Sequence, residues 1–229
     1  MNWELMIKWM PRLLEGAWLT LELVAIAVLA GLILAIPLGI ARSAQQAWVR
    51  ALPYGYIFFF RGTPLLVQLF LVYYGLAQFE AVRQSAFWPV LRDPYWCAVI
   101  TLTLHTAAYI AEILRGAIQA IPPGEIEAAR ALGMSRGQAL LRIILPRATR
   151  IGLPAYSNEV ILMLKASALA STITLLELTG MSRTIIARTY QPVEIFLMAG
   201  VFYLLSAYVL VRLFRVLEKR LRVDACQGR

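Results

Sequence analysis

Charged residues, cysteine and histidine are all scarce in this sequence. Only 15% of the 229 residues are charged, and there are two cysteines and one histidine. Cys97 and Cys226 fall in an expected membrane span and in the C-terminal tail, so we expect no disulfide between them. One histidine and two cysteines cannot build a metal site of known ligand spacing. We therefore expect no metal ion in this chain.

Two sequence patterns of enzyme chemistry are also missing. There is no GxxxxGK[ST] phosphate-binding loop, so the chain is not expected to hydrolyse ATP itself. There is no HExxH pattern, which argues against a metal-dependent intramembrane enzyme. We accordingly expect neither a catalytic residue nor a cofactor in this chain.

Hydrophobic residues make up 60% of the sequence, a balance that a soluble domain of this length would not carry. The apolar runs are close to 20 residues long and lack strict alternation, which favours helices over a β-barrel. We predict an all-α membrane protein, a single domain over residues 1–229, with five transmembrane helices. The expected spans are residues 18–41, 51–79, 95–115, 151–173 and 193–211.

Two stretches depart from a plain membrane span. Residues 1–17 place Trp3 and several aliphatic side chains at helical spacing, which indicates an interfacial amphipathic segment. The second apolar run is interrupted between Arg61 and Pro64, where Thr63 followed by proline is a helix-start signature. This run is either one kinked helix or a short segment followed by a main span from Pro64.

The Lys and Arg residues are distributed unevenly between the two ends of the expected spans. Segments on one side carry fourteen of them, and segments on the other side carry six. The first set is residues 42–53, 115–150 and 212–229, and the second is residues 1–17, 80–94 and 177–194. The positive-inside rule places the N-terminus outside and the C-terminus in the cytoplasm. The net charge of +9 is thus explained by topology, and we expect no nucleic-acid partner.

The longest polar-rich segment, PPGEIEAARALGMSRGQALLRIILP, begins at Pro122 and ends at Pro146. Its Pro-Pro-Gly start ends the preceding span and opens a helix. Gly133 falls where a helix stops and the backbone needs a left-handed residue. Ser135 and Gln138 have the spacing of a capping box, which starts a second helix that Pro146 is expected to close. A small helical hairpin of this kind suits docking into a groove of a partner protein.

The same segment resembles the EAA loop of ABC-importer permease subunits, and every fixed position of that pattern is filled. We place the loop at residues 119–150. In that family it is the cytoplasmic coupling helix that inserts into the ATP-hydrolysing subunit. The resemblance therefore implies a coupling role for Glu127, Ala128, Ala129, Gly133, Ile143, Leu145 and Pro146.

Polar side chains inside the expected spans need partners, because an ionisable group in hydrocarbon costs roughly 2.5–3.5 kcal/mol on insertion scales. Glu159 with its neighbours Asn158 and Ser157 can receive a cationic side chain or an α-ammonium group, so we place a substrate pathway there. The alternative is that these groups only hold helices or subunits together.

Three further charged residues are candidates for the same pathway. Arg61 either receives a substrate carboxylate or binds lipid headgroups at the inner interface. Glu112 and Lys165 either line the pathway or neutralise each other across two helices. His105, four and seven residues from Thr101 and Glu112, shares a helical face with them and is expected to be a packing residue.

The resemblance extends over nearly the full chain. FFFRGTPLLVQLF, HTAAYIAE, LPAYSNEVILMLK and RTYQP are similar to the polar-amino-acid branch of these permeases, most of all to subunits that import histidine, lysine, arginine and ornithine. This implies a type I ABC importer permease fold in the bacterial inner membrane. Relatives that import glutamine, glutamate or opines share these patterns, so such substrates stay open.

The resemblance also implies partners. These are a second permease subunit (a copy or a homologue), a dimer of ATP-binding subunits that carries ATP and Mg, a periplasmic amino-acid-binding protein, and membrane lipid. A stand-alone secondary transporter or channel is the alternative class. Five spans without an inverted repeat argue against such a transporter.

Overall fold

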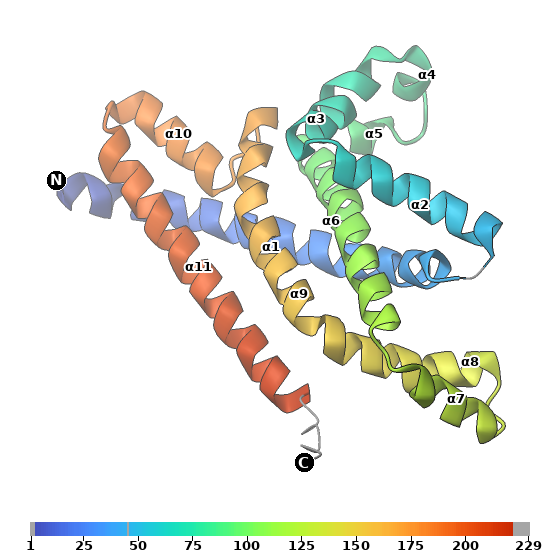
Figure 1. The fold of residues 1–229 in the computed structure, drawn as a ribbon. Helices are drawn as coiled ribbons and strands as arrows, with labels where there is room; N and C mark the ends of the chain where they lie inside the picture. The colour runs from blue at the N-terminus through green and yellow to red at the C-terminus, as the bar shows by residue number, and fades with distance from the viewer. Residues whose placement is uncertain (1–2, 45, 222–229) are drawn as a thin grey trace.

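The computed structural model of the chain describes residues 3–44 and 46–221, and every regular element in these ranges is helical (Figure 1). Three helices are long and apolar enough to cross a membrane: α1 (Trp3–Arg42), α6 (Pro94–Gln119) and α11 (Pro192–Leu221). Two bent helix pairs are apolar enough when each is taken together, which gives up to five spans. These five units lie where the sequence predicts spans. The orientation and the count of crossings stay predictions.

The first helix is longer than the span that we expected. α1 has 40 residues. At 1.5 Å per residue it is about 60 Å long, whereas the hydrocarbon core of a bilayer is about 30 Å thick. The expectation of a separate interfacial segment over residues 1–17 is wrong, because from Trp3 onward one helix runs through Pro11. Leu13 packs against Leu178 and Ile195, so this stretch has a protein partner.

The second apolar run is broken rather than kinked. α2 (Ala47–Gly62) and the helical segment Leu65–Gln78 meet at an angle of 103°. That segment starts as α3 (Leu65–Phe70) and continues through a π-helical and a 3₁₀ turn. Thr63, expected to start the second helix, instead closes α2, since its hydroxyl donates to the Phe59 carbonyl at 2.8 Å.

Two short helices, α4 (Glu80–Arg83) and α5 (Trp88–Leu91), lead from this segment to α6. Asp93 caps α6, because its side chain accepts a hydrogen bond of 2.9 Å from the Tyr95 N–H. Proline follows the cap directly, at a position where no N–H is needed.

The polar segment after α6 forms a hairpin of helices. Its first arm is α7 (Pro123–Ala131). The second arm starts as α8 (Arg136–Ala139), passes through a π-helical turn at Leu140–Ile144 and continues as α9 (Leu145–Ala166). The hairpin projects from one end of the helix assembly (Figure 1).

Pro146 does not close the second arm, contrary to our expectation. The helical run is continuous from Arg136 to Ile173. In the π-helical turn, the Leu145 N–H bonds to the Leu140 carbonyl five residues earlier. Such a turn re-routes the i→i−4 bonding that a proline cannot complete. The second arm of the hairpin and the following span are therefore one helix.

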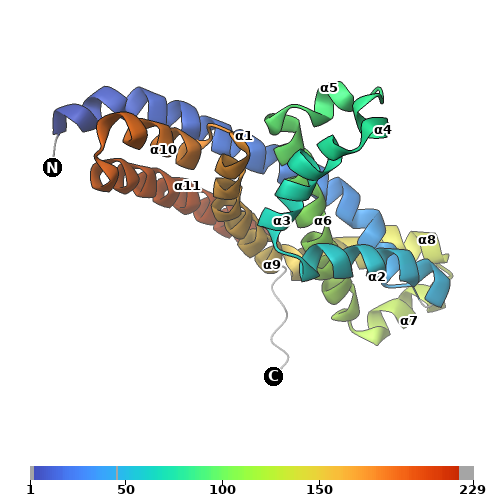
Figure 2. The same ribbon diagram turned by 90° about the horizontal axis from the view of Figure 1, so that it is seen from above.

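A further helix lies in the stretch between the fourth and fifth expected spans. After a 3₁₀ segment (Ser167–Ile173), α10 (Leu178–Thr189) departs at 49°. α10 packs on α1 and α11, and both views show it beside them (Figures 1 and 2). Residues 176–192, expected only as a connection, thus form a packed element.

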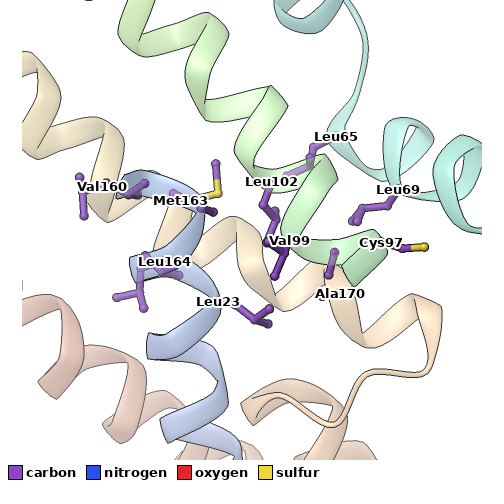
Figure 3. Packing of buried hydrophobic residues seen from close by; sticks show 14 of the residues in the cluster. Leu23, Leu65, Leu69, Cys97, Val99, Leu102, Val160, Met163, Leu164 and Ala170 are labelled. Carbon is purple, nitrogen blue, oxygen red and sulfur yellow. The ribbon is translucent and has the colours of Figure 1, made fainter. Parts of the chain in front are cut away.

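The largest buried apolar cluster joins α1, α3, α6 and α9. Figure 3 shows side chains from these helices converging on one another. The residues labelled there are Leu23, Leu65, Leu69, Cys97, Val99, Leu102, Val160, Met163, Leu164 and Ala170. Cys97 is a free thiol in this cluster. Cys226 lies outside the described residues.

Small residues bring α1 and α6 close together. A Cβ on Gly31 would lie 2.4 Å from the Thr106 methyl carbon, and one on Gly39 would lie 2.9 Å from the Ala111 carbonyl oxygen. With Ala35 these glycines repeat every four residues, the pattern that lets membrane helices approach closely. α6 is thereby held on one side by α1 and on the other by α9, which positions the polar side chains described next.

Candidate functional site

The hairpin is built by the local signals that the sequence predicts. Gly133 has φ +74°, the left-handed conformation that ends α7. The capping box is complete: the Gln138 N–H donates to Ser135 Oγ at 3.3 Å, and the Ser135 N–H donates to Gln138 Oε1 at 2.9 Å. Because these contacts span at most three residues, the turn is specified by its own sequence.

The residues of the EAA pattern divide into buried and exposed sets. Ala129 is buried, whereas Glu127, Ala128 and Pro146 are exposed. Gly133 is exposed at the tip, and Ile143 and Leu145 are half-buried. The pattern therefore serves both the inner packing of the hairpin and its outer surface.

Two exposed leucines make part of the outer surface of the hairpin apolar. Leu132 is 80% exposed and Leu141 is 66% exposed. Large apolar side chains at such exposure on a polar hairpin mark a surface for another protein.

The base of the hairpin is fastened to the membrane helices. Ile126 and Ile144 pack on a small cluster formed by Ala117, Ile121 and Ala148. This cluster joins both arms to the end of α6. The hairpin is thus continuous with α9 and packed on α6.

A polar centre lies where α6 and α9 cross. Glu159 is buried and accepts a hydrogen bond of 3.3 Å from the Thr106 hydroxyl. Glu159, His105 and Tyr109 are among the residues that line a cavity of about 130 Å³. Pockets that enclose a whole ligand measure roughly 300–1,000 Å³. The cavity is therefore too small to enclose a whole ligand by itself.

Arg61 reaches the same region from the end of α2. Its guanidinium carbon lies 5.1 Å from the centroid of the Tyr109 ring. Its Nη1 lies 4.0 Å from Glu112 Oε1, and Glu112 also accepts a 2.6 Å bond from Arg115. Tyr109 lines both the cavity at Glu159 and a second one of about 370 Å³ that Arg61 lines. Arg61 and Glu159 are thus linked through one aromatic ring.

Glu112 and Lys165 do not neutralise each other, and that alternative is wrong. Glu112 pairs with arginines, and Lys165 is exposed. α6 and α9 run antiparallel, since Thr106 contacts Glu159, and a Cβ on Gly152 would lie 3.4 Å from Ala117, eleven residues beyond Thr106. Glu112 lies six residues beyond Thr106 on α6, and Lys165 lies six residues beyond Glu159 on α9. Because the helices are antiparallel, these steps point in opposite directions and separate the two charges by about 18 Å along the helix axes.

The neighbours of Glu159 point in different directions. Ser157 is buried, whereas Asn158 is exposed on the same uncovered side of α9 as Lys165. Of the six predicted pathway residues, the structure therefore brings together Glu159, Arg61 and Glu112 around Tyr109. It leaves Asn158 and Lys165 on a face that no other part of the described chain covers.

Gln68 and Glu177 are two of the buried polar residues that the sequence interpretation missed. Gln68 donates through Nε2 to the Phe60 and Thr63 carbonyls at 2.9 and 3.1 Å, and its Oε1 lies 3.0 Å from His105 Nδ1. It therefore fixes the break between α2 and α3 and ties it to α6. The sequence feature that could have indicated this role is a glutamine in an apolar run directly after a helix break.

Glu177 is the second such residue. It is fully buried at the start of α10 and accepts N–H bonds from Thr179 and Gly180, both at 2.9 Å. The hydroxyls of Tyr203 and Thr20 donate to it at 3.0 and 3.3 Å. Glu177 thereby joins α1, α10 and α11. It is fully supplied with donors and so has a structural role.

The hairpin tip also matches the spacing of the GxSxG nucleophile motif, from Gly133 to Gly137. Ser135 is occupied as a helix cap, and the chain's one histidine, His105, lies in α6 within the membrane assembly. The match therefore carries no catalytic site.

The comparisons with known proteins agree with this geometry. The family described as "Binding-protein-dependent transport system inner membrane component" matches residues 26–223. The chain belongs to this family.

Individual members of the family are similar over most of their length. The octopine transport system permease protein of Rhizobium meliloti is 49% identical, over 94% of this chain and 86% of its own. The nopaline transport system permease protein of Agrobacterium fabrum is 46% identical, over 95% and 91%. The histidine/lysine/arginine/ornithine transport system permease protein of Escherichia coli K12 is 47% identical, over 90% and 87%.

Solved structures show the same helical arrangement. A crystal structure of an amino acid ABC transporter with histidines matches with a TM-score of 0.85 and 33% identity, over 96% of this chain and 99% of that one. The inward-facing MetNI methionine ABC transporter matches with a TM-score of 0.79 at 18% identity, over 94% and 99%. The fold resembles that of type I ABC importer permeases.

Proposed function

We propose that this chain is the permease subunit of an ATP-driven importer for basic amino acids, namely arginine, ornithine, lysine and histidine, or for opines that keep the arginine side chain. The observation that carries the proposal is the buried carboxylate of Glu159 at a cavity between α6 and α9. Glu159 has no basic partner at ion-pair distance among the described residues. Such a buried carboxylate suits a cationic ligand group, because the ligand then neutralises it.

The relatives' names support a cationic substrate, and they fit an amino acid and an opine equally. Octopine and nopaline are arginine conjugates that keep the guanidinium group and carry additional carboxylate. The permeases named for them are 49% and 46% identical over 94% and 95% of this chain, and the one named for histidine, lysine, arginine and ornithine is 47% identical over 90%. The guanidinium or ammonium end of either substrate class would face Glu159, and carboxylates would face Arg61 across Tyr109.

A second permease subunit would complete the site. The cavity at Glu159 is about 130 Å³, and Asn158 and Lys165 lie uncovered on the same helix. A facing copy or homologue would supply the opposite wall and use the amide of Asn158. Lys165 would then be placed to hold a carboxylate or to pair across the interface.

The remaining partners follow from the hairpin. An ATP-binding subunit dimer, which binds ATP and Mg, would receive the α7–α8 hairpin on the cytoplasmic side of a bacterial inner membrane. A periplasmic binding protein would deliver substrate on the other side. Closure of the ATPase dimer would move the hairpins and thereby switch the pathway between its two openings.

Uptake by the complete transporter tests the proposal. The full complex in proteoliposomes, with its binding protein and ATP, should accumulate radiolabelled arginine or octopine and not glutamate. Glu159→Gln should lower the initial rate at least about tenfold, since losing one partner of a buried charge contact costs about 2–5 kcal/mol. Glu80→Gln changes an exposed carboxylate in α4 and is the matched control.

The outcomes separate the parts of the proposal. Equal uptake by wild type and Glu159→Gln would remove Glu159 from the pathway. Uptake that continues without the ATP-binding subunits would instead indicate a stand-alone carrier. Preference for glutamate would overturn the cationic substrate class.

A further inference from the structure

Two adjoining cavities lie between the end of α1 and α2, and the second of them shares only Tyr109 with the cavity at Glu159. The first measures about 460 Å³ and is lined by Arg42, Ala47, Arg50, Ala51 and Tyr54. The second, of about 370 Å³, shares Arg42 and Tyr54 and extends to Arg61. Together they form a basic cleft, the Arg42–Arg50 cleft, at the junction of the two helices.

Glu112 lines the second cavity and attracts Arg42, so the positive charge of the cleft is compensated only in part within the described chain. Arg61 and Arg115 share Glu112, whereas Arg42 and Arg50 form no ion pair with any described residue. The Arg42 guanidinium carbon lies 4.9 Å from the centroid of the Tyr54 ring, which holds the guanidinium in place. Its Nε is buried and has no hydrogen-bond acceptor in this part of the chain. A buried donor of this kind favours an external acceptor.

The start of α2 adds to the positive field. Ala47, its first residue, lines the cleft, and Gln46 before it provides no side-chain cap. The uncapped N–H groups at the start of a helix carry partial positive charge and bind anions. Two arginines and a helix N-terminus therefore surround one cavity, and together they suit a phosphate.

The surroundings of the cleft favour a lipid over a free anion. Trp48 and Leu52 on α2 are both 79% exposed, and Phe58, which lines the second cavity, is 69% exposed. Tryptophan is enriched at the headgroup level of membranes. A free phosphate would not contact this apolar surface, whereas the acyl chains of a lipid would cover it.

We propose that the Arg42–Arg50 cleft binds the phosphate of an anionic phospholipid, whose acyl chains lie along the exposed face of α2. Basic pockets between membrane helices recognise lipid headgroups in this way. The junction of α1 and α2, which holds the cleft, lies at the same end of the assembly as the α7–α8 hairpin (Figure 1), so the lipid belongs to the leaflet on the hairpin side. The bound lipid fixes the start of α2 relative to the end of α1, and Arg61 lies in the last turn of the same helix.

Native mass spectrometry of the assembled transporter, released from detergent with added lipid, tests the proposal. Wild type should retain phosphatidylglycerol in preference to phosphatidylcholine, and 10 mM inorganic phosphate should not displace it. The double variant Arg42→Gln/Arg50→Gln should bind phosphatidylglycerol about thirtyfold more weakly, at roughly 1 kcal/mol per basic residue. Arg83→Gln removes an exposed arginine in α4 and should bind as wild type does.

Each outcome of these measurements either supports or overturns the lipid site. Arg42→Lys/Arg50→Lys keeps the charge and should regain most of the lipid preference, which separates loss of charge from loss of fold. Unchanged lipid retention in the glutamine variant, or equal retention of phosphatidylcholine by wild type, would overturn the proposal. Displacement by inorganic phosphate would identify a soluble-anion site instead and would overturn the lipid assignment.

Discussion

Arg147 Nη2 lies 3.2 Å from Glu125 Oε1, so an ion pair joins the beginning of α7 to the beginning of α9. The two arms of the hairpin are thereby connected at their base, while the Gly133 turn connects them at the tip. Both side chains are partly exposed, and such a pair contributes at most about 1 kcal/mol. Its main effect is to fix the orientation of the hairpin relative to the span that continues from it.

The exposed leucines of the hairpin should govern binding of the ATP-binding subunit. Leu132→Glu or Leu141→Glu places a charge on a surface that would become buried, and we expect loss of copurification with that subunit. Leu132→Met keeps the apolar surface and should copurify normally. Thermal stability of the permease itself should be unchanged, because both side chains are largely exposed. Full copurification of both glutamate variants would show that another surface makes the contact.

Gly133→Val should loosen the hairpin tip. The left-handed backbone at φ +74° costs a residue with a Cβ about 1–2 kcal/mol, and a β-branched residue at least as much. Hydrogen exchange of the amides around the turn should become faster. Gly137→Ala is the control, since it has ordinary φ and open space around it. Equal protection in both variants would contradict the assigned role of the turn.

Gly180→Ala should destabilise the junction between α9 and α10. The added Cβ would lie 2.1 Å from the Leu175 carbonyl oxygen, which the backbone can relieve only by moving. We expect a loss of about 1–3 kcal/mol or more in denaturant unfolding. Gly200→Ala, in α11 with nothing within 4 Å, should be neutral or slightly stabilising. A Gly180→Ala variant as stable as wild type would disprove the close packing.

Tyr203→Phe should cost about 1–3 kcal/mol of stability, because it removes a donor to the buried Glu177 carboxylate and leaves Thr179 without its 2.9 Å partner. The comparison is Tyr208→Phe, five residues further along α11 and 55% exposed, which should change stability by less than about 0.5 kcal/mol. Unfolding curves in detergent measure both. Similar values for the two tyrosines would show that the network at Glu177 contributes little.

The sequence predicted the hairpin well because its determinants are local. Gly133, Ser135 and Gln138 act within a few residues, and their effect needs no knowledge of the rest of the fold. Pro146 was misjudged because the π-helical turn upstream accommodates it. A π-helical turn has no residue pattern that can be recognised in a single sequence.

Long-range packing explains the other differences. The helix before Trp18 continues because Leu13 meets Leu178 and Ile195 from the far end of the chain. Glu177 was missed for the same reason, since its donors Thr20 and Tyr203 come from two other helices. The candidate site was predicted in part: Glu159 stood out as a charge in an apolar run, but its contact with Thr106 depends on how the helices cross.

The continuous helical run from Arg136 to Glu159, which includes the π-helical turn at Leu140–Ile144, would act as a lever arm if the hairpin moved. At 1.5 Å per residue it is about 35 Å long, so a tilt of about 10° at the hairpin would displace the carboxylate by roughly 6 Å. A displacement of that size exceeds the length of a hydrogen bond. Small rotations at the hairpin would therefore suffice to make or break the contacts of a ligand bound at Glu159.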